Sequence, residues 1–99
     1  MTKQAIIVIG GGILSTYAIR RAKELSYHTI CTDRDPACMG AKEADDFEQA
    51  DVYSVNEQIV AALKLKARYG DALKGIFVGG IDAAHIAATV ARVMGWPGV

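Results

Sequence analysis

The hydrophobic pattern of the chain begins with an unbroken apolar run over residues 5–9, which three glycines follow. A continuous apolar run is typical of a strand buried on both faces, as in a parallel sheet. Residues 28–33 and 75–78 are predicted to form two further strands, and a weaker edge strand is expected near Phe47. The pattern therefore predicts about four strands separated by longer amphipathic or polar segments.

Three of the intervening segments carry apolar residues at helical spacing. They cover residues 13–25, 54–69 and 83–94. The side chains expected to face inward are Leu14, Ala18, Ala22 and Leu25 in the first helix, Ile59, Leu63 and Ala67 in the second, and Ile86, Val90 and Val93 in the third. A single helical turn is also expected within residues 37–46.

Capping residues mark where these helices begin and end. Ser54 and Glu57 have the spacing of a capping box, and Asp82 is a good N-cap for the last helix. Gly70 and Gly95 follow the second and third helices, where a left-handed stop favours glycine.

The order of these elements predicts one α/β domain over residues 1–99. Strands that alternate with helices at this spacing form βαβ units with right-handed crossovers, and hence a parallel sheet. We expect a three-layer α/β/α, Rossmann-like domain with about four strands in the order 3-2-1-4.

Composition and charge exclude several kinds of protein. Hydrophobic residues make up 52% of the chain and charged residues 22%, which is ordinary for a globular domain. The 11 basic and 11 acidic residues cancel, so the chain lacks an electrostatic footprint for nucleic acid or a membrane surface. The apolar runs are too short for a membrane span or a signal-peptide core. We expect a cytoplasmic protein in which Cys31 and Cys38 are reduced thiols.

Glycine-rich turns after the first and last predicted strands mark the expected ligand site. Gly10, Gly11 and Gly12 follow one strand, and Gly79 and Gly80 follow the other. In the order 3-2-1-4 the strand order reverses between these two strands, and ligands bind there, outside the carboxyl ends of the strands. Glycines let an anionic group approach main-chain N–H groups, although they also simply permit the turns.

Asp33 favours a second interpretation, a nicotinamide cofactor. It ends the second predicted strand, where dinucleotide-binding folds hold a ribose hydroxyl. The glycine fingerprint is incomplete, because Ser15 occupies the place of its third glycine. Asp33 and Arg34 are equally compatible with a solvated charge pair, so NAD binding stays an alternative.

A catalytic apparatus is not evident in the sequence. It contains no Walker A pattern, nucleophilic triad or carboxylate pair. His28 and Cys31 on one strand would point to opposite faces and could not ligate one metal ion. His85, at the start of the last helix, is more typical of a surface residue than of a general base. We predict a binding crevice without catalytic or metal-ligating residues.

An ordered set of short motifs spans nearly the whole chain. The motifs are Ile7-Val8-Ile9-Gly10-Gly11-Gly12, Ala22-Lys23-Glu24-Leu25, Thr32-Asp33-Arg34-Asp35-Pro36, Gly75-Ile76-Phe77-Val78-Gly79-Gly80-Ile81-Asp82-Ala83-Ala84 and Met94-Gly95-Trp96-Pro97-Gly98. The set resembles the N-terminal pre-ATP-grasp domain (biotin-carboxylase-N-like) of ATP-grasp carboxylate–amine ligases, whose relatives include carbamoyl-phosphate synthase. The chain departs from that pattern at Ser15 and Ser26, which replace common glycines.

The resemblance implies a part in joining a carboxylate to an amine through an acyl phosphate. ATP and magnesium would sit in later domains of such an enzyme, so this domain would hold no cofactor and would not catalyse alone. The residues implied to line the small-molecule carboxylate or phosphate are Gly10, Gly11, Gly12, Gly79, Gly80 and Asp82, with Asp33 and Arg34 as rim candidates.

The final Gly-Trp-Pro-Gly-Val segment is typical of a domain edge and predicts an N-terminal fragment of a longer enzyme. The partners would then be the ATP-grasp domains of the same chain. The surface that they cover would be apolar and would favour self-association. A stand-alone binding module with the same fold is the remaining alternative, since fold does not fix function.

Overall fold

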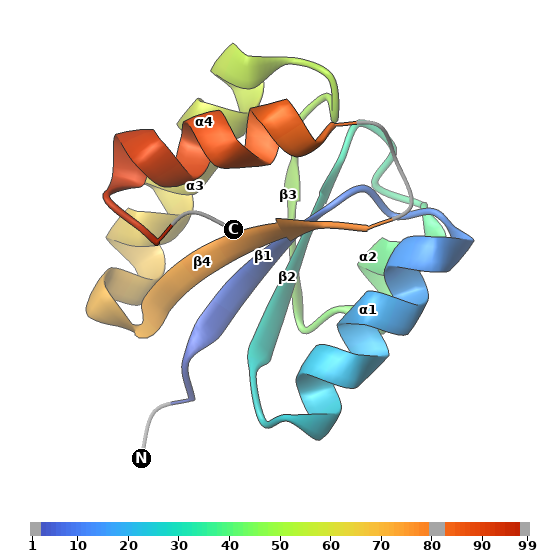
Figure 1. Cartoon of the computed structure of the whole chain (residues 1–99). Coiled ribbons are helices and arrows are strands. Elements are labelled where there is room, and N and C mark those ends of the chain that lie inside the picture. The colour runs from blue at the N-terminus through green and yellow to red at the C-terminus, as the bar shows by residue number, and fades with distance from the viewer. Residues whose placement is uncertain (1–2, 80–82, 98–99) are drawn as a thin grey trace.

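The computed structural model describes residues 3–79 and 83–97 of the chain. A four-stranded sheet lies between two layers of helices, with α1 and α2 on one face and α3 and α4 on the other (Figure 1). The elements in chain order are β1 (Ala5–Ile9), α1 (Ile13–Glu24), β2 (His28–Asp33), α2 (Met39–Glu43), β3 (Asp46–Gln49), α3 (Val55–Tyr69), the 3₁₀ turn η1 (Gly70–Ala72), β4 (Leu73–Val78) and α4 (Ala84–Met94).

The sheet has the order β3-β2-β1-β4, and each neighbouring pair is parallel. Ala5 of β1 pairs with His28 on one side and with Leu73 on the other, and the β1–β4 register shifts just after this residue. The predicted α/β class, the parallel sheet and the order 3-2-1-4 are therefore confirmed. The weak edge strand expected near Phe47 is β3, and the single helical turn is α2.

The main hydrophobic core lies between the sheet and the α3–α4 layer. Ile7 and Ile9 of β1 and Ile30 of β2 are fully buried there against Leu65 of α3 and Ile86 of α4. A smaller core, made of Val8, Ile19 and Cys31, fills the space beneath α1. Strand β1 is thus covered on both faces, as its unbroken apolar run predicts.

The predicted inner face of α1 is wrong. Its buried residues are Ser15, Thr16 and Ile19, whereas Leu14 is 57% exposed and Leu25 is 56% exposed. The physical reason is that the Ser15 hydroxyl bonds to the end of β4, which fixes the rotation of the helix. The stripe of Ala18, Ala22 and Leu25 then borders a groove beside β4 and does not enter the core.

The inner faces of α3 and α4 are also only partly as predicted. Ile86 and Val90 of α4 are buried, but Val93 is exposed. In α3, Ile59 packs against the core, whereas Leu63 and Ala67 lie on the exposed side. The buried positions of α3 are Gln58, Ala61, Ala62 and Leu65.

The helix ends follow the predicted chemistry with one change. Ser54 Oγ accepts a hydrogen bond from the N–H of Glu57 at 3.2 Å, as in a capping box, but the Glu57 carboxylate turns to the N–H of Asp51. Gly70 and Gly95 have φ of +60° and +75°, where glycine avoids steric strain. The predicted N-cap Asp82 lies outside the described residues, and Ala83 precedes α4.

Ser26 adopts φ of +70°, a conformation that favours glycine. The expectation that serine here replaces a left-handed glycine is consistent with this backbone. The strain costs of the order of 1 kcal/mol. It is small enough for the surrounding helix and strand to hold the turn.

A polar cluster lies at the β3 edge of the sheet, opposite β4, and consists of Asp46, Glu48, Arg68 and Tyr69. The carboxylate of Asp46 accepts hydrogen bonds from the Tyr69 hydroxyl and from Arg68 Nη1, both at 2.6 Å. Burial acts to raise the pKa of Asp46, but the bonds from Tyr69, the Phe47 N–H and Arg68 outweigh it and lower the pKa below its usual value.

We predict that this cluster makes stability fall in acid. Because the pKa of Asp46 is lower in the folded state, its contribution is present above the unfolded pKa of about 4 and is lost as the pH falls through the folded pKa. Urea unfolding measured between pH 3 and pH 7 should show this loss, with a flatter profile for Asp46→Asn. The same change at the exposed Asp71 should leave the profile as in the native protein.

Candidate functional site

The glycine turn after β1 is held by hydrogen bonds from its own first two amides. Gly10 has φ of +91° and donates its N–H to the carbonyl of Thr32 at 2.7 Å. Gly11 donates its N–H to Asp33 Oδ2 at 2.8 Å. Both amides therefore bond to residues at the end of β2, which fixes the turn against the neighbouring strand.

Gly11 also makes a close approach to α2. The N–H of Gly40 donates to the Gly11 carbonyl at 2.9 Å. A Cβ placed on Gly11 would overlap the Cys38 sulfur, and one placed on Gly40 would lie 2.7 Å from Gly11 Cα and 2.9 Å from Cys31 Sγ. Neither position has room for a side chain unless its neighbours move.

Ser15 joins the two glycine turns to one another. Its side chain is buried, and its hydroxyl donates to the carbonyl of Gly79 at 2.8 Å, from the first turn of α1 to the end of β4. A Cβ added to Gly79 would lie 2.9 Å from Cε1 of Phe77, so the ring leaves no room for a side chain there. Gly79, at the end of β4, thus lies beside the first turn of α1, where the strand order reverses.

Asp33, the last residue of β2, is bonded to the glycine turn after β1 and does not merely border it. Besides the bond to Gly11, its Oδ1 accepts the N–H of Asp35 at 2.9 Å. Arg34 is exposed, and its carbonyl accepts a hydrogen bond from the Gln49 side chain. Two of the predicted lining residues, Gly80 and Asp82, lie outside the described residues.

The start of α1 has the geometry of an anion-binding helix end. Gly12 is the exposed N-cap, and a Cβ added to it would meet nothing within 4 Å. The first turn of the helix carries no acidic side chain, and the first N–H groups of any α-helix lack intrahelical partners. Such a helix end attracts negative charge through its dipole and its free donors.

Three residues that support the site were not identified from the sequence. Gln58, which is buried, accepts the Thr32 hydroxyl at 3.0 Å and donates to the carbonyls of Ala50 and Asp51. It therefore holds β2 directly behind the glycine turn. A glutamine near the start of an amphipathic helix is normally a surface residue, so the pattern gave no signal for it. The close approach of Gly40 and the bond of Ser15 likewise depend on tertiary placement.

Two cysteines lie beneath the turn, and both are free thiols. Cys31 is buried, and burial together with the neighbouring Cys38 raises the pKa of its thiol well above the usual range. Such a thiol is protonated and unreactive at neutral pH. The expectation of reduced cysteines is consistent with this environment.

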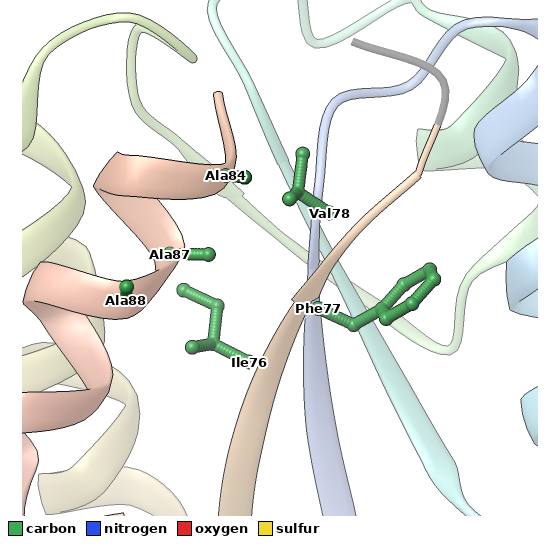
Figure 2. A pocket seen from close by; sticks show the side chains of 6 residues that line it. All are labelled: Ile76, Phe77, Val78, Ala84, Ala87 and Ala88. Atoms are coloured by element: carbon green, nitrogen blue, oxygen red, sulfur yellow. The ribbon is translucent and has the colours of Figure 1, made fainter. Parts of the chain in front are cut away.

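Two apolar grooves border β4, and among the described residues neither is lined by a glycine of the two turns. A groove of about 200 Å³ lies between β4 and α4 and is lined by Ile76, Phe77, Val78, Ala84, Ala87 and Ala88 (Figure 2). The side chains that line it are apolar, so they can contact an apolar group but provide no acid, base or nucleophile. Within residues 3–79 and 83–97, the structure contains no helix of the length and hydropathy that crossing a membrane requires.

Comparison with models of known protein families finds no match, and no curated protein matches the sequence. Two solved structures share the fold. N5-carboxyaminoimidazole synthetase from Staphylococcus aureus, complexed with ADP, aligns with a TM-score of 0.65 and 22% identity over 92% of this chain and 23% of its own. L-amino acid ligase from Bacillus licheniformis aligns with a TM-score of 0.72 and 10% identity over 100% of this chain and 25% of its own.

One of these proteins is a synthetase and the other a ligase by name, and this chain spans about a quarter of the length of each. At these identities the likeness is one of fold. The resemblance to a domain of ATP-grasp ligases, drawn from the sequence motifs, is thus confirmed at the level of the fold.

Proposed function

We propose that this chain is the N-terminal, substrate-side domain of an ATP-grasp ligase, and that it binds the carboxylate or phosphate group of a small-molecule substrate at its glycine turns. The observation that carries the proposal is the likeness in fold to two ATP-grasp ligases. In the proposed enzyme, ATP and magnesium bind to other domains. The catalytic groups belong to those domains as well, so this domain positions substrate and does not react with it.

The anionic group fits best at Gly12 and the first turn of α1. The N–H groups of Gly10 and Gly11 already bond to Thr32 and Asp33, and the Asp33 carboxylate would repel an anion at that part of the turn. Beyond it, the helix start offers donors and a favourable dipole. Gly79 forms the opposite wall in this proposal, and Gly80 and Asp82 remain further candidates.

The nicotinamide alternative loses its main support from the placement of Asp33. Each of its carboxylate oxygens already accepts one main-chain N–H group, from Gly11 in the turn after β1 and from Asp35 in the loop after β2. A ribose hydroxyl could bond only to the lone pairs that these two N–H groups leave free. The acid therefore serves the conformation of the loop, and the shape of the turn accounts for its presence without a cofactor.

The anion site can be tested by titrating the ¹⁵N-labelled protein with inorganic phosphate and, separately, with acetate and NADH. We expect saturable amide shifts centred on Gly12, Ile13 and Leu14, with a Kd of about 1 mM or weaker for so small an anion. NADH should produce no saturable shift. Saturation by NADH at micromolar concentration would instead support the oxidoreductase interpretation.

A matched pair of variants separates this site from general charge effects. Ile13 and Tyr17 are both 57% exposed and lie one turn apart on α1. Ile13→Glu places a negative charge in the first turn and should weaken phosphate binding about tenfold, which corresponds to about 1.4 kcal/mol. Tyr17→Glu should weaken it much less, because the helix-end effect decays within one turn. Equal losses in both variants would argue against the proposed position.

The ligase role has an independent test in the coding sequence that adjoins these residues. An open reading frame that continues into a glycine-rich nucleotide loop and paired acidic magnesium ligands would support it. A stop codon directly after Val99 would remove the ligase role and leave the anion site to its own titration. The chain alone, mixed with Mg-ATP, a carboxylate and an amine, should release no ADP.

A further inference from the structure

Two free thiols lie against the glycine turn after β1, one beside each of its first two glycines. Cys31 of β2 is buried, and its S–H donates to the carbonyl of Gly10 at 3.6 Å. Cys38, which directly precedes α2, lies so close to Gly11 that a Cβ on that glycine would overlap its sulfur. Cys38 also packs against the small core to which Cys31 belongs. The two thiols therefore form one cluster at the turn.

The two thiols differ in their access to solvent. Cys31 is fully buried, and burial together with the neighbouring Cys38 raises the pKa of its thiol well above the usual range. Cys38 is half-buried, and the residues on both sides of it, Ala37 and Met39, are exposed. A small oxidant in solution can therefore reach Cys38, whereas Cys31 is too buried and too weakly acidic to react first.

We propose that Cys31 and Cys38 are a redox pair that a hydroperoxide converts into an intramolecular disulfide, and that this bond draws Cys38 away from Gly11. In the first step a peroxide oxygen bonds to the Cys38 sulfur, the O–O bond breaks, and an alcohol leaves, or water when the oxidant is hydrogen peroxide. In the second step the Cys31 sulfur attacks the resulting sulfenic acid. The S–S bond forms, the S–O bond breaks, and the departing oxygen takes the Cys31 proton and leaves as water. The two thiols together lose two electrons, which the peroxide gains.

The placement of Cys31 favours the second step over further oxidation of Cys38. A sulfenic acid beside a second thiol condenses with it to a disulfide, whereas an isolated one can be oxidised irreversibly to a sulfinic acid. Cys31 provides that second thiol from within the core. Its burial also keeps thiols in solution from competing with Cys38 for it.

The disulfide would reach the glycine turn by two routes. The Cys38 sulfur fills the space beside Gly11, so this contact is lost when the sulfur turns toward Cys31. The Gly11 carbonyl also accepts the N–H of Gly40 at 2.9 Å, so a shift at the start of α2 moves a hydrogen-bond partner of the turn. Oxidation should therefore change the surroundings of Gly11.

Mass spectrometry of the intact protein after treatment with hydrogen peroxide tests the disulfide. We expect the mass to fall by that of two hydrogen atoms without dimer formation, and a dithiol reductant should restore it. The Gly11 amide resonance should shift on oxidation and return on reduction, while that of Gly75, whose Cβ position is open, stays in place. Sulfinic acid on Cys38, or disulfides only between molecules, would overturn the proposal. A disulfide that leaves Gly11 unchanged would overturn its link to the turn.

Single-cysteine variants check which thiol reacts first. Cys38→Ser should lose its remaining thiol at least about tenfold more slowly than the native protein loses its first, because the Cys31 thiolate is scarce. This variant leaves the core intact, since Cys38 is half-buried. Cys31→Ala, checked for a native amide spectrum, should accumulate a sulfenic acid on Cys38 that dimedone traps. Equal rates in Cys38→Ser and the native protein would overturn the order of the two steps.

Regulation of the anion site follows from this proposal and rests on the proposed function. Gly12 directly follows Gly11, so the oxidised protein should bind phosphate about threefold or more weakly than the reduced protein. An unchanged affinity would rule out regulation of that site by the disulfide. Protein that binds no phosphate in either redox state would contradict the anion site alone, because the mass and the Gly11 resonance report on the disulfide separately.

Discussion

Leu65→Ala is expected to destabilise the protein by about 2–5 kcal/mol, the range for removing a large buried side chain. Leu65 is fully buried between α3 and the sheet, in contact with the main core. The substitution removes apolar contacts and leaves a cavity that the surrounding strands can fill only in part. Urea unfolding followed by the far-ultraviolet circular dichroism signal would measure the loss as a lower midpoint.

The matched control is Leu63→Ala, two residues earlier on the same helix. Leu63 is 53% exposed, so its truncation should change stability by less than about 1 kcal/mol. The helical spacing alone placed Leu63 on the inner face, and the structure places Leu65 there. Equal losses in the two variants would mean that the rotation of α3 described here is wrong.

The course of the chain was largely predictable because its strands and turns are marked by local chemistry. The apolar run of β1 ends at Gly10, and its bounds are those expected from the sequence. Right-handed βαβ crossovers made a parallel sheet predictable, and the order 3-2-1-4 is the one expected of a Rossmann-like domain. The end of α3 at Gly70 was likewise visible, because the chain there needs a positive φ.

The rotation of the helices was less predictable, because polar contacts decide it. An apolar stripe defines a face only to within the width of that stripe, and one residue corresponds to about 100° of rotation. In α1 the hydrogen bond from Ser15 to Gly79 fixes which face of the helix turns inward, and in α3 the hydrogen bonds of Gln58 do the same. Spacing rules treat both residues as surface polar positions. Their hydrogen-bond partners are distant in the sequence, so the local sequence pattern cannot predict these bonds.

The candidate site was likewise only partly predictable from the sequence. The sheet order places Gly79 near the start of α1, as expected from the sequence, and ligand binding at the two glycine turns is the proposal made from it. The hydrogen bonds that the Gly10 and Gly11 N–H groups make within the protein were not predicted. They depend on where Thr32 and Asp33 lie in the neighbouring strand. The sequence suggests Asp33 as a ligand for ribose, whereas in the structure its carboxylate accepts a hydrogen bond from the Gly11 N–H. In the proposed anion site, the main-chain donors left free therefore begin at Gly12, two residues after the first glycine of the pattern.

Gly40→Ala should destabilise the protein by about 1–3 kcal/mol, although alanine normally stabilises a helix relative to glycine by up to about 1 kcal/mol. The added Cβ would lie 2.7 Å from Gly11 Cα and 2.9 Å from Cys31 Sγ. The first of these neighbours is main chain, which cannot rotate away. The steric cost therefore exceeds the gain in helix propensity, and relief requires α2 and the glycine turn to separate.

Gly75→Ala is the matched control, because a Cβ at Gly75 would meet nothing within 4 Å and φ there is not positive. It should leave stability unchanged or raise it by about 0.5–1 kcal/mol through the lower entropy of the unfolded chain. The amide resonances of Gly11 and Gly12 should move in Gly40→Ala and stay in place in Gly75→Ala. If Gly40→Ala proved as stable as the native protein, the close contact between α2 and the turn would not exist as described, and the position of the Gly11 amide would not depend on it.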